Sequence, residues 1–216
     1  MPKIVDHDKR REEIAKVACM VVAELGFEQA TTIKIAEAAG YTTGMIAHYF
    51  TSKKEIIQAA LHLSLKRVEQ RLQVNGESLG AVLSNMLPLD AERAREASFW
   101  TAYWGKVLAD EELQKVNQWV HREYAKLYER VFSRYWPEWS QWTKSTRKIV
   151  QNAISTFIDG ATIRSALFPK ENPPELLMEQ LNRQLTLWFG YAVELEKTQS
   201  DKESLVSLSN ESRRVR

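Results

Sequence analysis

The sequence predicts an all-α protein of about nine helices, and three observations lead to that prediction. Glycine and proline are scarce, with 8 and 6 in 216 residues, so few positions interrupt regular structure. Apolar residues recur every three to four positions over long windows, whereas no stretch keeps the alternation typical of a strand. Hydrophobic residues make up 44% and charged residues 27%, which is typical of a globular chain with a packed core.

The first and fourth helices of the chain are predicted from a stripe and a cap. Apolar residues spaced along Ile14–Leu25 form one helical face, and Gly26 is expected to end that helix. Ser52 and Glu55 form a capping box at the start of a later helix that extends to about residue 72.

Two short helices lie between them, at about 32–39 and 43–49, on either side of Gly40. Gly40 supplies the positive φ that a tight turn requires, and the small Ala36 lets the second helix cross close over the first. Apolar groups fall where a helix-turn-helix needs inward side chains: Ile35, Ala39, Tyr41, Ile46 and Tyr49. The outward positions are mostly small and polar: Thr42, Thr43, Gly44, Met45, Ala47 and His48. Such a face suits a recognition helix in the major groove of DNA.

The stretch "TTIKIAEAAGYTTGMIAHYFTSKKEII" resembles the DNA-binding domain of TetR-family transcriptional regulators, over residues 8–60 or so. "TTGMIAHYF" is most similar to the choline-responsive BetI branch, although Ala47 stands where many members have an aromatic residue. By that resemblance, the positions that touch DNA, mostly phosphates, are Thr43, Gly44, His48, Tyr49 and Lys53. Thr32 is expected to add a phosphate contact, Lys34 and Met45 to reach base edges, and Thr42 to share the face.

Aromatic residues are concentrated in the middle of the chain, where 12 of the 21 fall between Phe99 and Trp142. Trp100 and Trp104 are one helical turn apart, and Tyr103 is adjacent to their face. Asp159 lies in an apolar stretch of a later helix, where a carboxylate is costly to bury without a partner. These four residues are consistent with an aromatic box for an organic cation, and equally with a core in which Asp159 pairs with Arg164.

The remaining helices are expected at about 78–87, 91–109, 111–136, 143–168 and 174–197. The last two carry apolar stripes, and by the family resemblance they form a four-helix bundle with a second subunit. A two-fold homodimer is what a palindromic operator requires.

Several function classes are disfavoured by what the sequence lacks. The single cysteine, Cys19, excludes an intrachain disulfide and multi-cysteine zinc motifs, and no run is long and apolar enough to cross a bilayer. The charged N-terminal segment is not followed by the apolar stretch of a secretory signal, so we expect a cytoplasmic location. The four histidines are scattered and no HExxH, GxSxG or P-loop pattern occurs, so an all-α enzyme is the weaker alternative. We expect no cofactor and no metal.

We therefore expect a cytoplasmic, homodimeric transcriptional repressor that binds double-stranded operator DNA and responds to a small-molecule effector, with choline or another organic cation favoured. The DNA-binding domain is expected at residues 1–54 and the ligand-binding and dimerisation domain at 55–197, with 55–72 as the connecting helix. The charged, serine-rich end at 198–216 is expected to be a mobile tail. A formal net charge of only +2 predicts a local DNA-binding patch rather than a global field.

Overall fold

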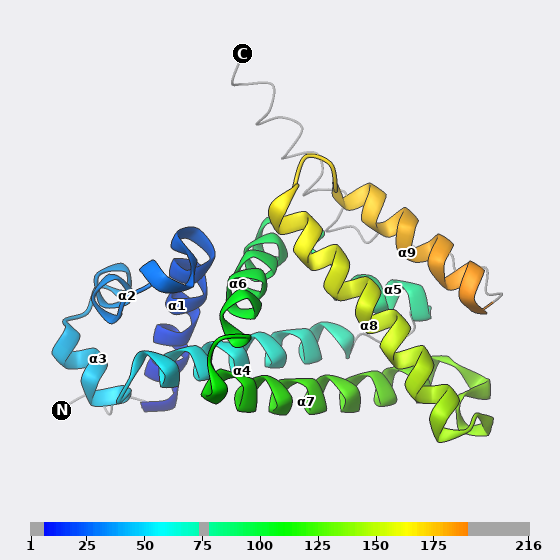
Figure 1. Ribbon diagram of the computed structural model, residues 1–216, viewed down its shortest axis with the longest axis horizontal. Coiled ribbons are helices and arrows are strands. Elements are labelled where there is room, and N and C mark those ends of the chain that lie inside the picture. Colours follow the sequence, from blue (N-terminus) through cyan, green and yellow to red (C-terminus); the bar gives the residue numbers. More distant parts are fainter. Residues whose placement is uncertain (1–6, 74–77, 190–216) are drawn as a thin grey trace, which may run out of the picture.

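The computed structural model describes residues 7–73 and 78–189 of the chain. Within these ranges it forms nine α-helices and one short 3₁₀ helix, with no strand, so the all-α prediction is confirmed (Figure 1). The expected tail at 198–216, and the expected extension of the last helix to 197, lie outside the described residues. None of the described helices is long and apolar enough to span a membrane.

Three helices form a head at one end of the molecule: α1 (His7–Gln29), α2 (Thr32–Ala39) and α3 (Thr43–Tyr49) (Figure 1). Gly26 interrupts the first helix at the position where the sequence predicted its end. Gly26 adopts φ 78° and ψ 166°, which kinks the helix, and the chain resumes helical structure as far as Gln29. The amide of Ala30 then donates to the Gly26 carbonyl over 3.2 Å, so the kink leaves that acceptor paired.

The fourth helix, α4 (Lys53–Leu72), leads from the head into the rest of the molecule (Figure 1). The Ser52 hydroxyl accepts from the Glu55 amide over 3.2 Å, as a helix cap should. The Glu55 carboxylate, however, does not close the predicted box on Ser52. It accepts from the Thr51 amide at 2.8 Å and pairs with Arg11 of α1 at 2.8 Å, so this cap also fastens α4 to the head.

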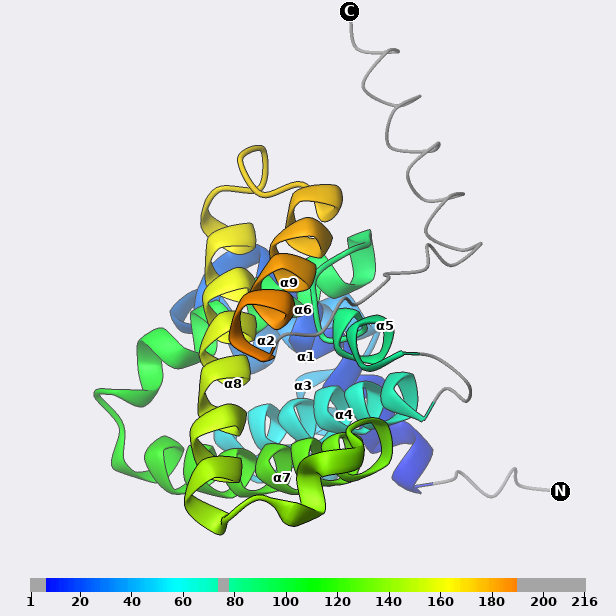
Figure 2. The ribbon, with the colours of Figure 1, turned by 90° about the vertical axis from the view of Figure 1, so that its right-hand side faces the viewer.

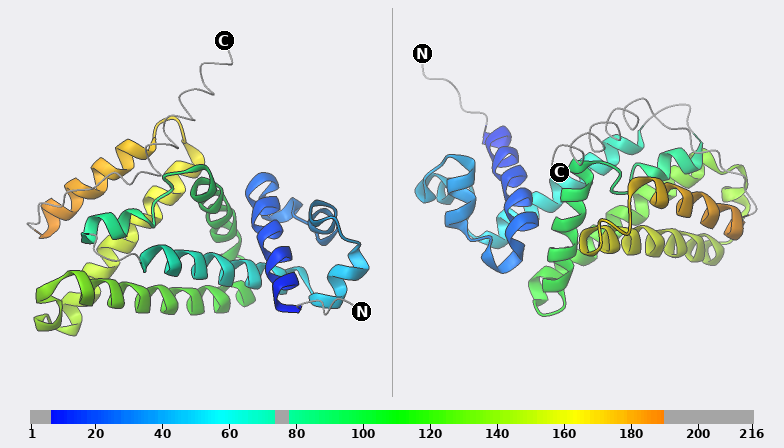
Figure 3. Two further views of the ribbon diagram at one scale, coloured as in Figure 1. Left: turned by 180° about the vertical axis from the view of Figure 1, so that it is seen from behind. Right: turned by 90° about the horizontal axis from the view of Figure 1, so that it is seen from above.

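The larger part of the molecule is built from the remaining helices: α5 (Leu79–Ser84), α6 (Ala91–Val107), α7 (Glu111–Tyr135), the 3₁₀ helix η1 (Pro137–Gln141), α8 (Lys144–Leu167) and α9 (Pro174–Phe189). The sequence had not predicted η1. Helices α4 and α7 run side by side, while α6 and α8 cross them to close a triangle (Figures 1 and 3). Helix α9 lies on the side away from the head, beside α5 and α8 (Figure 2).

Two apolar clusters form the core. The first joins all three head helices and the start of α4 to α6 and the start of α7, reaching from Ile14 to Val120. The second joins the end of α4 to α5, α8, α9 and the end of α7. Because the first cluster crosses the expected domain boundary at residue 54, the head is packed directly onto α6 and is not a separate body on a linker.

Candidate functional site

The turn between α2 and α3 is set by capping residues and one glycine. The Thr31 and Thr42 hydroxyls accept from the amides of Lys34 and Met45, over 3.3 and 3.1 Å, and so begin the two helices. Gly40 adopts φ 69° and ψ 30°, the left-handed conformation predicted for it. A Cβ there would contact nothing within 4 Å, so the backbone angle, rather than lack of space, requires glycine.

The exposed side of α3 has the composition that the sequence predicted. Ile46 is fully buried beneath it. The outward residues are all exposed: Thr42, Thr43, Gly44, Met45, Ala47 and His48. Together with half-exposed Thr32 and Lys34 of α2, they form one surface with hydroxyl, imidazole, thioether and ammonium groups and no carboxylate. We call this surface the α3 face.

Two residues assigned to DNA make contacts within the head. The Lys53 ammonium donates to the Phe27 carbonyl and lies 4.5 Å from the centre of the Phe27 ring, so it holds the end of α1 rather than a free phosphate position. Partial burial lowers its pKa. Tyr49 is only 9% exposed, and its carbonyl accepts from Arg11. The next cation, Lys54, pairs with Asp110, the N-cap residue of α7, and with Glu112 in the first turn of that helix.

His7 at the start of α1 extends the α3 face, and sequence reasoning missed it. Its ring centre lies 4.6 Å from that of Tyr49 and 6.0 Å from that of His48. Both histidines are exposed, so two imidazoles border the recognition helix. No local pattern could have revealed the pairing, because the two residues are separated by most of the head and meet only through the packing of α1 against α3.

A cavity of about 160 Å³ lies between α4, α6, α7 and α8. Four aromatic residues line it: Trp100, Trp104, Tyr124 and Tyr128. The Trp100 ring centre lies 5.7 Å from that of Trp104 and 6.1 Å from that of Tyr124. The predicted pocket residues Trp100, Trp104 and Asp159 therefore do meet at one cavity.

Tyr103 is a correction to the predicted pocket. Its side chain is fully buried in the first apolar cluster, and its hydroxyl donates to the Leu113 carbonyl over 3.3 Å. Burial raises its pKa to about 12. The later aromatics divide similarly, since Phe132, Trp136 and Trp139 pack against each other in the second cluster. The aromatic residues between Phe99 and Trp142 therefore serve two purposes: some line the cavity, and the others pack in the apolar core.

Asp159 is the carboxylate of the cavity that lacks an ion pair among the described residues. The alternative of a pair with Arg164 is not observed, because the Arg164 guanidinium donates to Asn172 instead, over 3.4 Å. Water reaches Asp159 through the open side of the cavity, yet the surrounding protein atoms desolvate the carboxyl group. This burial raises its pKa to about 6, against a hydrogen bond from Ser155 and the nearby His121, which both lower it.

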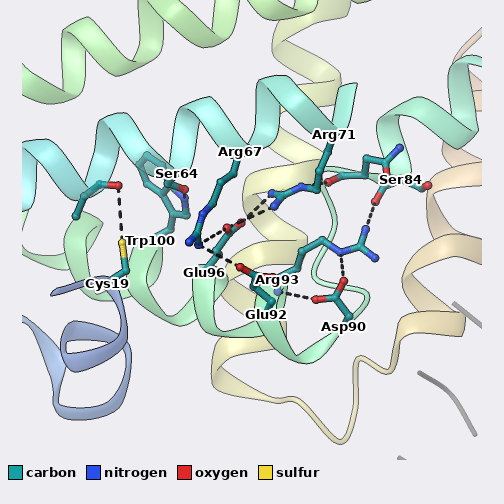
Figure 4. A network of polar contacts seen from close by, with 12 residues as sticks. Cys19, Ser64, Arg67, Arg71, Ser84, Asp90, Glu92, Arg93, Glu96 and Trp100 are labelled. Atoms are coloured by element: carbon teal, nitrogen blue, oxygen red, sulfur yellow. Dashed lines mark hydrogen bonds and ion pairs between the residues drawn. The ribbon is translucent and has the colours of Figure 1, made fainter. Parts of the chain in front are cut away.

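A second carboxylate in the cavity, Glu96, is fully paired. Its oxygens lie 2.8 Å from Arg71 and 3.5 Å from Arg67, both on α4, and Glu96 is 8% exposed (Figure 4). Next to it, the Trp100 indole N–H donates to the Ser64 hydroxyl of α4 over 3.0 Å (Figure 4). Two lining residues of α6 are therefore bound directly to α4, the helix that begins in the head.

Two family models match the chain. The model "Bacterial regulatory proteins, tetR family" matches residues 14–60, and "BetI-type transcriptional repressor, C-terminal" matches residues 76–189. The HTH-type transcriptional regulator BetI of Pectobacterium carotovorum is 26% identical over 200 residues, covering 86% of this chain and 99% of that protein. The regulator PksA of Bacillus subtilis is 34% identical over 110 residues, covering 48% of this chain and 54% of that protein.

Solved structures show the same fold. A transcriptional regulator from Rhodococcus sp. Rha1 superposes with a TM-score of 0.72 at 24% identity, covering 85% of this chain and 98% of that one. A regulator from Saccharomonospora viridis, solved in complex with choline, superposes with a TM-score of 0.66 at 18% identity, covering 84% of this chain and 97% of that one.

Proposed function

Because the chain belongs to the tetR family of bacterial regulatory proteins and carries a BetI-type C-terminal domain, we propose that it is a repressor released from its operator by a small organic cation such as choline. The observation that carries the proposal is the unpaired Asp159 carboxylate in a cavity walled by Trp100, Trp104 and Tyr124. Aromatic faces attract a cation that cannot donate hydrogen bonds, and the carboxylate neutralises its charge. The choline-bound relative from Saccharomonospora viridis supports this choice.

The α3 face is the proposed DNA-reading surface. We assign the outward side chains of α3, with Thr32 and Lys34, to the major groove and its phosphates. His7 joins them as a further contact. Tyr49 would act through its partly covered edge, and Lys53 would support the surface from behind by holding the end of α1.

Helix α4 is the proposed link between the cavity and the α3 face. Its first half packs in the apolar cluster of the head, and its second half binds Glu96 and Trp100 at the cavity wall. A cation that repositions Trp100 or Glu96 would therefore shift α4 and the head that it carries. The effector acts only if it binds the DNA-incompetent arrangement more tightly.

A homodimer is proposed to join two such heads through α8 and α9. Ile149, Ile163 and Leu167 are exposed on one face of α8, and Leu187 is 76% exposed on α9. Exposed apolar groups of this size on neighbouring helices are typical of a subunit interface. Two-fold symmetry would place one α3 in each of two successive major grooves.

Fluorescence anisotropy on labelled DNA from upstream of the gene tests the proposal, with choline titrated at fixed salt. We expect tight binding that choline relieves. Binding that is indifferent to choline would keep the regulator and refute choline as its effector, leaving other organic cations to be screened.

Thr43→Ala tests the α3 face in the same assay. It should weaken operator binding without changing the fold, because Thr43 is exposed and makes no cap. Thr42→Ala is unsuitable, since removing the α3 cap costs about 1 kcal/mol in stability. Ser133→Ala, an exposed change on α7, is the matched control. Equal operator affinity of both variants would remove Thr43 from the DNA-reading surface.

A further inference from the structure

A second cavity, of about 370 Å³, adjoins the first between α7 and α8. The two cavities share four lining residues: His121, Tyr124, Tyr128 and Ser155. A molecule bound between the aromatic rings of the first cavity therefore has a continuous wall along which it can extend into the second. We call the second cavity the basic groove.

The basic groove has a charge opposite to that of Asp159. Lys144, Arg147 and Lys148 of α8 line it, against one carboxylate, Glu129 of α7. That carboxylate is fully engaged: it accepts from Arg147 at 2.7 Å, from Gln151 at 2.9 Å and from the Trp139 indole at 3.0 Å. Lys144 and Lys148 are exposed and form no ion pair with any described residue. The groove thus presents two uncompensated ammonium groups.

Arg147 has an unused donor behind the same wall. Its Nη1 binds Glu129, but its Nε is buried and has no hydrogen-bond partner among the described residues. That Nε has no surface open to the groove, so a bound anion would meet the ammonium groups of Lys144 and Lys148 instead. A carboxylate or phosphate group there would form charge-assisted hydrogen bonds with the two lysines and neutralise their charge.

We propose that the basic groove binds the anionic group of an effector whose organic cation lies at Asp159, so that the natural ligand is an elongated zwitterion. This inference rests on the proposed function of the first cavity and goes beyond it, because choline carries no anion. The carboxylate and phosphate forms of such a ligand share the chemistry that the groove recognises, and matched probes can separate them.

Helix geometry sets the length of the ligand. At 1.5 Å of rise per residue, Asn152 and Lys148 lie about 10 and 16 Å along α8 from Asp159. A cation and an anion joined by one or two methylene groups cannot reach both ends. A trimethylammonium joined to a carboxylate by twelve methylene groups spans about 16 Å when extended and can reach Lys148.

Isothermal titration calorimetry at fixed ionic strength tests the inference with choline, glycine betaine, dodecyltrimethylammonium and 13-(trimethylammonio)tridecanoate. The matching 12-(trimethylammonio)dodecyl phosphate then shows which anion is preferred. We expect the long carboxylate to bind about tenfold more tightly than the dodecyl compound, and glycine betaine to gain nothing over choline. The double variant Lys144→Gln, Lys148→Gln should abolish that tenfold gain and leave choline affinity unchanged. Lys170→Gln, an exposed lysine outside both cavities, is the matched control.

The outcomes separate the two proposals. If choline binds but the long carboxylate has no advantage over the dodecyl compound, the anion site is refuted and the cation cavity stands. An advantage that survives the double lysine change likewise refutes the assignment to the groove. If neither choline nor any trimethylammonium probe binds, both proposals fail.

Discussion

Replacing Asp159 with asparagine isolates the charge of the proposed cation site while keeping its size. Burial raises the pKa of this carboxyl group from 3.8 to about 6, and a bound cation would stabilise the ionised form and lower the pKa again. A full return to 3.8 corresponds to about 3 kcal/mol of favourable interaction. Because water reaches the side chain, screening reduces this to about 1–2 kcal/mol, so Asp159→Asn should weaken choline binding about 5- to 30-fold at pH 7.5.

The same group predicts how affinity depends on pH. Above pH 6 the carboxyl group is already ionised and choline binds at full strength. Below pH 6 it is protonated in the free protein and must lose its proton when the cation binds. With the interaction of about 1–2 kcal/mol derived above, affinity of the unaltered protein should therefore fall about 3- to 8-fold between pH 7 and pH 5. Choline itself carries a permanent charge, so the Asn variant should lose much less.

Calorimetric titrations of both proteins at pH 5, 6, 7 and 8, at one ionic strength, provide the measurement. The difference between the two profiles reports on the charge of Asp159, together with its interaction with the nearby His121. Operator affinity without ligand serves as the control for folding. Parallel pH profiles, or equal choline affinity at pH 7.5, would refute the role of Asp159 as the partner of the cation.

Three further predictions concern stability, the aromatic wall and the link to DNA. Since the folded-state pKa of Asp159 is raised, its ionised form destabilises the free protein above pH 6. Asp159→Asn should therefore raise the Tm in thermal melts by about 2–4 °C at pH 7.5, and by less at pH 5. Trp104→Ala should weaken choline binding about tenfold and leave ligand-free operator affinity unchanged, whereas unfolding in circular dichroism would assign Trp104 to the core. Glu96→Gln removes the ion pairs with Arg71 and Arg67. The ratio of operator affinity without choline to operator affinity with saturating choline should then fall about 2- to 30-fold. An unchanged ratio would exclude the contact between Glu96 and α4 as the link from the cavity to DNA binding.

Features determined by neighbours in the chain were predictable. The cap at Ser52 and the left-handed Gly40 depend on a few consecutive residues, so their sequence patterns were sufficient. Trp100 and Trp104 share a helical face by spacing alone, which correctly brought them to one wall. The exposure of the α3 face follows from the same periodicity.

Features determined by distant packing were not predictable. Tyr103 is adjacent to Trp104 in the chain, but the helix turns it toward the α6–α7 connection, where the Leu113 carbonyl accepts its hydroxyl. Lys53 follows a helix cap and resembles a phosphate ligand, yet its ammonium group donates a hydrogen bond to the Phe27 carbonyl at the end of α1. In both cases the deciding partner comes from another helix, and no local pattern indicates where that helix passes.

The position of α4 limits how an effector can control this protein. Glu96 is held by two arginines of α4 and Trp100 by Ser64 of the same helix, so the cavity wall cannot rearrange on the α6 side without changing contacts of α4. The head cannot absorb that change by bending at a linker, because α1 and α4 share one apolar cluster with α6. A shift of α4 must therefore appear as a change in the orientation of the α3 face. Binding to a two-fold operator depends on that orientation, because both recognition helices of a dimer must fit their half-sites at once.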